Sequence, residues 1–294
     1  MSMDRITVFG EVLFDCFPDG EKVLGGAPFN VAWHLQAFGQ RPRFVSSVGD
    51  DDEGDIIRNA MQRWGMDTAT LQTDPARRTG QVQVSLHQGE PAYDIVDGVA
   101  YDFIDPARID EVPGGILYHG SLALRNATSR QALEKLKSQH PPAVFMDVNL
   151  RAPWWRREQV LGWIDAADWL KLNEDEYALL HGASSDPLAT GDGFLRRHRL
   201  RGLVVTRGAR GAVAILPDRE PVEVAPVQAL EVVDTVGAGD ALSAVLLLGL
   251  NLGWPMRQTL ERAQSFASGL VGRRGATVDD PAFYASFVDA WKLV

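Results

Sequence analysis

The sequence predicts an α/β fold in which a mostly parallel β-sheet is covered by helices on both faces. Short runs rich in β-branched and aromatic residues alternate with segments of helical periodicity along the chain. These runs are apolar on both faces, which is typical of strands buried inside a parallel sheet. The chain has 294 residues, a length that α/β folds often use as one unit and that can bury a large core.

The pattern places the elements in order along the chain. The predicted strands are ITVFG (6–10), RFVSSVG (43–49), ILYHGS (116–121), AVFMDVN (143–149), DWLKLN (168–173) and GLVVTRG (202–208). The predicted helices between them include NVAWHLQAFG (30–39), GDIIRNAMQRWG (54–65) and SRQALEKLKSQ (129–139). Another helix is expected from Asp240 onward, and because it is apolar almost all round, it should be buried.

Two segments interrupt this pattern and are predicted to form antiparallel hairpins. Residues 11–24 contain a strand, a Pro-Asp-Gly turn and a second strand, and residues 80–96 alternate apolar and polar side chains. We expect residues 11–24 and 80–103 to form a small extra sheet within a single domain spanning 1–294. Such a sheet would be a lid if it covers the carboxyl edge of the main sheet. The alternative is two edge hairpins without that role.

Composition excludes several classes of function. The net charge of −10 argues against a nucleic-acid backbone or an anionic membrane surface as the main partner. The N-terminus does not resemble a signal peptide, and the longest apolar run is too short to span a bilayer, so a cytoplasmic location is expected. The single cysteine, Cys16, cannot form an internal disulfide and is interpreted as an inert thiol. The six histidines show no metal-ligand spacing.

The stretch VVDTVGAGDALSAVLLLGL (232–250) predicts an anion-binding helix end. Gly237, Ala238 and Gly239 have small or no side chains, and the buried helix that follows presents unpaired N–H groups and a positive dipole end. Asp240 stands directly beside this turn. The dinucleotide pattern GxGxxG is absent where such a fold would require it, and so is the P-loop pattern GxxxxGK[ST].

Two further loops have both a functional and a structural interpretation. In GGAPFN, Gly25 and Gly26 permit a close backbone approach, and the Asn30 amide suits a polyol hydroxyl or caps a helix. In KLNEDEYALL, Asn173 and Glu176 have the spacing of a capping box. Their alternative role is to help hold a hydrated Mg²⁺ at the end of a strand.

The last predicted strand leads into a tight turn, TRGARG (206–211). In this turn Gly208 and Gly211 either let backbone N–H groups cradle nucleotide phosphates or form an ordinary β-turn.

Taken together, these loops resemble the PfkB-type carbohydrate kinases of the ribokinase-like superfamily. GGAPFNVAWHLQAFG (25–39), with Gly49 ten residues on, is similar to the N-terminal signature of that family, and DTVGAGDALSA (234–244) is similar to its C-terminal signature. AYDFID and NVAWHL are similar to fructokinase-like members. Leu242 and Val245 depart from the family pattern, which favours an aromatic residue and a small residue there.

The resemblance implies a three-layer α/β/α domain with a β-sheet lid, which transfers the γ-phosphoryl group of ATP to a sugar hydroxyl with Mg²⁺. Asp240 would be the general base, and the backbone of Gly237, Ala238 and Gly239 would stabilise the transferring group. The residues that would hold the sugar are Asp15, Gly25, Gly26, Asn30, Asn149 and Arg151. The residues that would hold the nucleotide are Asn173, Glu176, Thr206, Gly208 and Gly211, with Glu176 reaching Mg²⁺ through water.

The resemblance also implies a monovalent cation such as K⁺ near Asp234 and Val236. Fructose is the first candidate acceptor, followed by a related ketose or sugar acid. A homodimer through the lid is expected because its sheet edges can pair between subunits. The alternatives are a nucleoside kinase of the same fold and a non-catalytic sugar- or nucleotide-binding regulator. A dinucleotide oxidoreductase is disfavoured because its fingerprint is missing.

Overall fold

A nine-stranded β-sheet forms the centre of the computed structural model, which describes residues 5–87, 90–110, 115–139, 143–182, 186–226 and 235–293. The strand order is β13-β12-β11-β10-β9-β8-β1-β4-β5. Neighbouring strands are parallel except at β12 and β13. The strands are β1 (Arg5–Phe9), β4 (Arg43–Gly49), β5 (Leu71–Asp74), β8 (Gly115–His119), β9 (Ala143–Asp147), β10 (Trp169–Asn173), β11 (Gly202–Thr206), β12 (Ala212–Ile215) and β13 (Val222–Val224).

The strand order reverses direction beside β1. From β1 the chain continues to β4 and β5 on one side, and it then returns to β8 on the other side and continues outward from there. In open α/β sheets, ligands bind outside the carboxyl ends of the strands at such a switch point. The topology therefore predicts a ligand site formed by the loops that follow β1, β9, β10 and β11.

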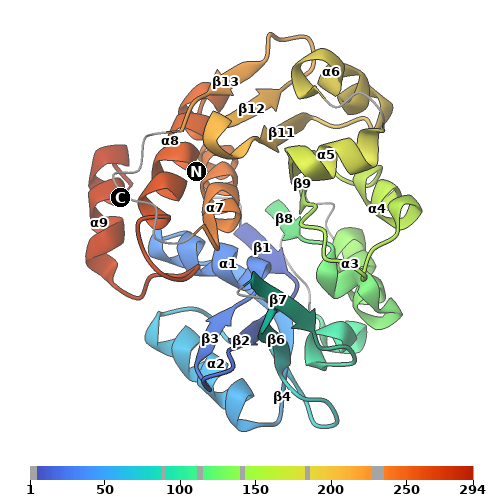
Figure 1. The fold of residues 1–294 in the computed structure, drawn as a ribbon, viewed down its shortest axis with the longest axis vertical. Coiled ribbons are helices and arrows are strands. Elements are labelled where there is room, and N and C mark those ends of the chain that lie inside the picture. Colours follow the sequence, from blue (N-terminus) through green and yellow to red (C-terminus); the bar gives the residue numbers. More distant parts are fainter. Residues whose placement is uncertain are drawn as a thin grey trace.

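Helices cover both faces of this sheet, as predicted (Figure 1). In the view shown, α1, α7, α8 and α9 lie to the left of the sheet and α3, α4, α5 and α6 to its right. The helices are α1 (Ala27–Ala37), α2 (Asp52–Arg63), α3 (Ala127–Gln139), α4 (Arg157–Ile164), α5 (Glu174–His181), α6 (Pro187–Arg197), α7 (Ala238–Leu252), α8 (Met256–Leu270) and α9 (Pro281–Trp291).

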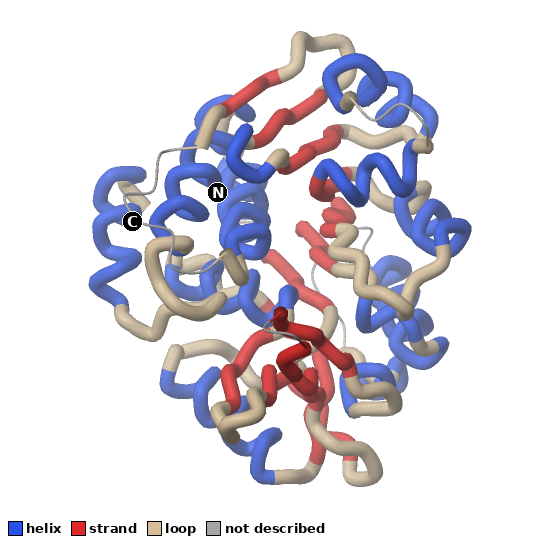
Figure 2. The backbone as a smooth tube through the Cα atoms, viewed as in Figure 1, coloured by secondary structure: helices blue, strands red, loops and turns tan. Residues whose placement is uncertain are grey.

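A separate four-stranded sheet has the order β3-β2-β6-β7. Its strands are labelled in Figure 1 and drawn in red in Figure 2. Both predicted hairpins are present: β2 (Leu13–Cys16) pairs antiparallel with β3 (Lys22–Gly25), and β6 (Gly80–His87) with β7 (Glu90–Ile95). The two hairpins are joined by parallel pairing of β2 with β6. Residues 88–89, within the second predicted hairpin, lie outside the described part of the chain.

Helix α7 is the buried helix that the sequence predicts. It packs between α1 and α8, and every residue from Ala241 to Gly249 is buried. Leu242 and Val245, the two departures from the family pattern, are 3% and 0% exposed, so both are packing positions. Burial of each such leucine or valine stabilises the fold by about 1.5–3 kcal/mol. Among the described residues, no helix is long and apolar enough to cross a membrane.

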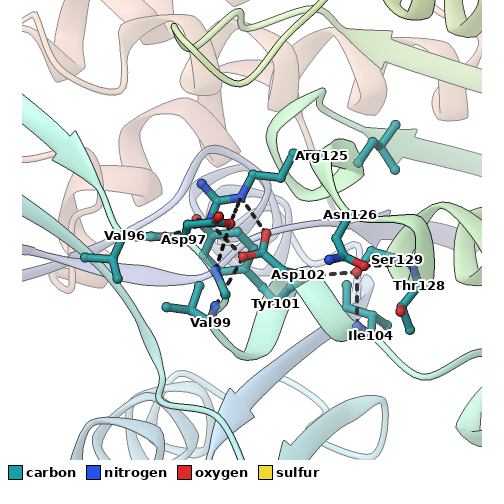
Figure 3. A network of polar contacts seen from close by, with 12 residues as sticks. Val96, Asp97, Val99, Tyr101, Asp102, Ile104, Arg125, Asn126, Thr128 and Ser129 are labelled. Atoms are coloured by element: carbon teal, nitrogen blue, oxygen red, sulfur yellow. Dashed lines mark hydrogen bonds and ion pairs between the residues drawn. The ribbon is translucent and has the colours of Figure 1, made fainter.

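A buried ion pair ties the small sheet to the main body (Figure 3). Arg125, at the end of η3 (Leu122–Arg125), donates to both carboxylate oxygens of Asp102 at 2.6 and 2.8 Å. Asp102 lies in η1 (Ala100–Phe103). The same guanidinium donates to the Val96 carbonyl at 2.6 Å, one residue beyond β7, and lies 4.4 Å from the ring of Trp154. One cation thus joins the end of a small-sheet strand to two short helices.

Replacement of Arg125 by methionine is expected to lower the free energy of unfolding by about 3–5 kcal/mol, because it leaves the Asp102 carboxylate buried and unpaired. The matched control is Arg196→Met. Arg196 pairs with Asp192 and Asp218 on the surface, where ion pairs contribute about 0–1 kcal/mol. Urea unfolding of both variants measures the difference. Equal losses would contradict a special role for the buried pair.

Candidate active site

The loops singled out in the sequence converge on the carboxyl ends of the parallel strands. Glu11 follows β1, Asn149 follows β9, and Asn173 and Thr206 are the last residues of β10 and β11. Since β1, β8, β9, β10 and β11 are parallel neighbours, these ends lie along one edge of the sheet. Helix α7 brings Asp240 to the same edge, where Asp240 accepts a hydrogen bond from Asn30 of α1 and the neighbouring Gly239 lies beside Lys171 of β10.

The turn before α7 requires glycine at its first position. Gly237 is the N-cap, with φ 79° in the left-handed region. A Cβ atom added there would lie 2.5 Å from the Cα of Ala276. Ala276 lies in the segment GRRGAT (272–277), so this segment lies against the turn. Ala238, Gly239 and Asp240 then form the first helical turn, whose N–H groups have no acceptor further back in the helix. The Ala238 N–H donates weakly to the Thr235 carbonyl at 3.3 Å.

Asp240 is held by a residue from the other signature. Asn30 of α1 donates from Nδ2 to the Asp240 Oδ2 at 2.7 Å. Burial raises the pKa of Asp240 to about 6, against the lowering effect of this hydrogen bond. Nearby Asp147 also raises it, while Lys171 and Arg151 lower it. A carboxylate with a pKa close to neutral pH is suited to accept a proton during a reaction.

Two oxygen acceptors face the space beside Gly25. A Cβ atom on Gly25 would lie 3.9 Å from both the Asn30 Oδ1 and the Asp15 Oδ2. The Asn30 Oδ1 is buried and has no hydrogen-bond partner in the described part of the chain. Gly26 has φ 109°, and a Cβ atom there would lie 2.8 Å from the Glu11 carbonyl oxygen. The glycine at position 26 thus permits a close approach of the backbone at Glu11. At Gly25, the missing side chain leaves the Asn30 Oδ1 and the Asp15 Oδ2 facing the same space.

Glu11 is a site residue that the sequence reasoning missed. It is 2% exposed, and its Oε2 has no partner among the described residues. Burial raises its pKa to about 7, while the charges of Arg151 and Arg125 lower it and that of Asp240 raises it. The available signal was an acidic side chain placed directly after the first strand.

The charge of Arg151 acts on three carboxylates. Its charge lowers the pKa of Glu11, Asp15 and Asp240, although burial raises all three. Arg151 itself is exposed and donates to the Leu150 carbonyl at 3.0 Å. One cation therefore balances acidic groups from the β1 loop, the small sheet and α7.

The loop that carries Asn149 and Arg151 is anchored at Asn149. This residue has φ 43°, a left-handed conformation that asparagine tolerates better than most residues. Its carbonyl accepts a hydrogen bond from the Ser121 Oγ at 3.3 Å.

Asn173 and Glu176 form the capping box of α5. The Asn173 Oδ1 accepts from the Glu176 N–H at 2.8 Å, and the Glu176 Oε2 accepts from the Asn173 N–H at 2.9 Å. The other oxygen, Oε1, accepts from the Leu150 N–H at 2.7 Å. Glu176 therefore fixes both the start of α5 and the loop after β9. The structural interpretation is confirmed, and a role for these two residues toward Mg²⁺ stays a prediction.

The turn after β11 is positioned beside α5. Gly211 has φ 82°, and a Cβ atom there would lie 2.0 Å from the Val224 carbonyl oxygen, so glycine is required. Gly208 has φ 54° with open space around it. Arg210, between them, pairs with Glu174 in the first turn of α5. Thr206, Gly208 and Gly211 therefore lie near the start of α5, and their role toward a nucleotide stays a prediction.

The proposed cation site is only partly described. Asp234 lies outside the described residues. Val236 is described and is 49% exposed, immediately before the Gly237 turn.

A second missed feature is a buried ion pair. Lys171 of β10 and Asp147 of β9 are paired at 2.9 Å, with side chains 8% and 1% exposed. The signal was one charged residue in each of two otherwise apolar strands. Their adjacency could not be foreseen, because it depends on the register of β9 against β10.

The sheet, its helical layers, the small second sheet and the α7 turn with its adjacent carboxylate define a ribokinase-like α/β protein. A family model described as pfkB family carbohydrate kinase matches residues 3–282. The chain belongs to this family and is a sugar kinase.

Individual relatives agree with this assignment. A fructokinase of Klebsiella pneumoniae is 35% identical over 263 residues, which cover 84% of each chain. The crystal structure of a fructokinase from Vibrio cholerae, bound to fructose, ADP and calcium ion, has a TM-score of 0.82 at 29% identity and covers 97% of this chain and 99% of that one. An aminoimidazole riboside kinase of Salmonella enterica shares the fold, with a TM-score of 0.84 at 24% identity over 97% of this chain and 100% of that one.

Substitution of Gly237 by alanine is expected to lower the free energy of unfolding by about 3 kcal/mol or more, because strain at positive φ adds to the overlap with Ala276. The control is Gly253→Ala at the other end of α7, where φ is 68° and nothing lies within 4 Å of the new atom. Chemical denaturation of both variants should show a loss of only about 1–2 kcal/mol for the control. Similar losses at both ends would mean that the Ala276 contact is unimportant.

Proposed function

We propose that this sugar kinase transfers the γ-phosphoryl group of ATP to a hydroxyl of fructose or of a related ketose or sugar acid. The observation that carries the proposal is the partly desolvated Asp240 at the N-terminus of α7, hydrogen-bonded to Asn30 from the other signature. Similarity to fructokinases supports fructose as the first acceptor to test.

In this reaction Asp240 is the general base. A sugar hydroxyl oxygen attacks the γ-phosphorus, its proton passes to an Asp240 carboxylate oxygen, and the bond from the γ-phosphorus to the β,γ-bridging oxygen breaks to release ADP. The Asn30 amide directs Asp240 by holding the Oδ2 at 2.7 Å. The Asp240 Oδ1 is then available to the incoming hydroxyl.

The backbone of the turn stabilises the transferring group. The N–H groups of Ala238, Gly239 and Asp240 present a positive helix end to the phosphoryl oxygens. Gly237, Ala238 and Gly239 have small or no side chains and keep the approach open. The Ala238 N–H donates only weakly, at 3.3 Å to the Thr235 carbonyl, so this amide too can be drawn toward an anion. Phosphoryl transfer depends mainly on such positioning and charge stabilisation.

The sugar would lie between the small sheet and α1. Asp15 and Asn30 present acceptor oxygens to hydroxyl groups, and Gly25 and Gly26 allow the ring to approach the backbone. Asn149 and Arg151 would close the pocket from the β9 loop, where Arg151 balances Asp15 and Asp240. In this arrangement the small sheet is a lid within one domain spanning 1–294, and its edge strands are the surface for a homodimer.

The nucleotide would lie along the ends of β10 and β11, held by Asn173, Glu176, Thr206, Gly208 and Gly211. Both Glu176 oxygens accept backbone N–H groups, so this carboxylate fits a hydrated Mg²⁺ through water better than direct coordination. Among the described residues, no group of three or more His, Cys, Asp or Glu side chains is placed to hold a metal ion. When bound, Mg²⁺ neutralises phosphate charge. Asp234 and the backbone near Val236 remain our proposal for a monovalent cation such as K⁺.

A nucleoside kinase is the second candidate. It is favoured by the fold shared with the riboside kinase of Salmonella enterica. A non-catalytic regulator is disfavoured by the intact turn and by Asp240.

Asp240→Asn is expected to lower kcat about 10²–10⁴-fold, because the isosteric amide cannot accept the proton. The assay couples ADP release to a panel of acceptors: fructose, other ketoses and aldoses, a sugar acid and nucleosides. Asp192→Asn, a surface carboxylate on α6, is the control and should retain full activity. Full activity of Asp240→Asn would remove its assignment as base, and preference for a nucleoside would favour the second candidate.

The pH dependence of kcat/KM should have an acidic limb near pH 6. The pKa of Asp240 is raised to about 6, so the base is protonated and inactive below that value and ionised above it. Activity should therefore fall about tenfold per pH unit below the limb and level off above it. The residual activity of Asp240→Asn should lack this limb. An unchanged limb in the variant would assign it to another group, with Glu11 the first alternative.

A further inference from the structure

A buried lysine lies beneath the catalytic turn. Lys171 donates from Nζ to the Asp147 Oδ1 at 3.1 Å and Oδ2 at 2.9 Å. The two residues are direct register partners on parallel strands β9 and β10. A buried ion pair is often no more stabilising than apolar residues of the same size. Its presence in two apolar strands therefore calls for an explanation other than stability.

The pair is attached to the helix that carries Asp240. Ser243, one turn further along α7, donates from Oγ to the Asp147 Oδ2 at 2.8 Å. Tyr118 of β8 donates to the same oxygen at 3.4 Å. Asp147 thus collects bonds from β8, β10 and α7, and it fixes α7 against the strand ends.

The Lys171 ammonium lies against the turn itself. A Cβ atom added to Gly239 would lie 3.1 Å from the Lys171 Nζ. A cation is ordinarily disfavoured at the positive end of a helix. Here it is held by Asp147, and the charges of Glu176 and Asp240 are also within reach. The Lys171 ammonium and the positive N-terminal end of α7 repel each other, so their close approach is favourable only when a negatively charged group lies beside both.

We propose that Lys171 is a positioning residue for phosphoryl transfer: with Asp147, which accepts from Ser243, it fixes α7 at the strand ends, and it supplies a fixed positive charge beside Gly239 and Asp240. The inference rests on the proposed function. Burial lowers the pKa of Lys171, but the neighbouring carboxylates of Asp147, Glu176 and Asp240 outweigh this and keep it above its ordinary value.

The proposal makes a prediction about Asp240 that a purely structural role does not. The charged groups that act on Asp240 are Asp147, which raises its pKa, and Lys171 and Arg151, which lower it. Glu11, whose own pKa is raised by Asp240, also lies at this edge, as do Asp15 and Glu176. Loss of Lys171 alone leaves Asp147 unopposed, so the acidic limb should move to higher pH. Loss of both Lys171 and Asp147 removes two opposing effects on the pKa of Asp240, so the acidic limb should return to about its wild-type position.

The test compares Lys171→Met with the double variant Lys171→Met/Asp147→Asn. In the single variant we expect the acidic limb to shift upward and kcat to fall about 10-fold or more, below the 10²–10³-fold typical of a direct donor to the transferring group. KM for the sugar should stay near the wild-type value, because Lys171 lies outside the sugar pocket. In the double variant the limb should return while kcat stays low. Lys137→Met, in an exposed pair with Glu134, is the control and should change neither.

The double variant also guards against misfolding, because it leaves no unpaired buried charge where the single variant leaves Asp147. A double variant with wild-type kcat would overturn the proposal, as would a limb that does not move in a folded single variant. Ser243→Ala, which removes one bond to Asp147 without changing any charge, should lower kcat with no shift of the limb. The Asp240→Asn variant separates the proposed function from the proposed role of Lys171. If Asp240→Asn stays fully active, the proposed function fails. If Asp240→Asn is inactive but the double variant is fully active, only the role of Lys171 is contradicted.

Discussion

The hydrogen bond from Asn30 to Asp240 is the interaction on which the site depends. It joins two residues 210 positions apart, one at the start of α1 and one at the start of α7. Both helices cover the same face of the sheet, and their packing brings two signatures of the chain into contact. The same asparagine presents its second amide atom to the space beside Gly25 and Asp15. One side chain therefore links the proposed acceptor pocket to the proposed base, so that the hydroxyl, the base and the helix end are aligned by the fold.

At the carboxyl edge of the main sheet, buried carboxylates lie close to cations that offset their negative charge. Glu11, Asp15 and Asp240 are all partly or fully desolvated, and the charge of the exposed Arg151 lowers the pKa of each. Next to the Gly237–Asp240 turn, Lys171 and Asp147 form a buried ion pair in which the two charges offset each other. A buried carboxylate without such partners would simply take up a proton. The surrounding cations and the Asn30 amide instead hold the pKa of Asp240 near 6, where it is ionised at neutral pH and still basic enough to act.

Much of the fold could be predicted from periodicity. RFVSSVG forms β4 with the expected bounds, the helix at the GAG turn is buried, and both hairpins are present. The capping box of Asn173 and Glu176 follows from spacing alone. What escaped prediction depends on contacts between distant segments: Lys171 meets Asp147 only through strand register, and Ser243 reaches Asp147 across 96 positions. Glu11 was missed because a single acidic residue after a strand carries no spacing signal of its own.

Direct titration of the Asp240 carboxyl group by NMR, in protein labelled at aspartate side chains and assigned with Asp240→Asn, tests the central claim most directly. We predict a midpoint near pH 6 in the wild-type protein and a higher midpoint in Asn30→Ala, because the hydrogen bond from Asn30 lowers the pKa. A midpoint near the ordinary aspartate value of 3.8, unchanged in Asn30→Ala, would contradict an Asp240 that is desolvated by the fold and directed by Asn30.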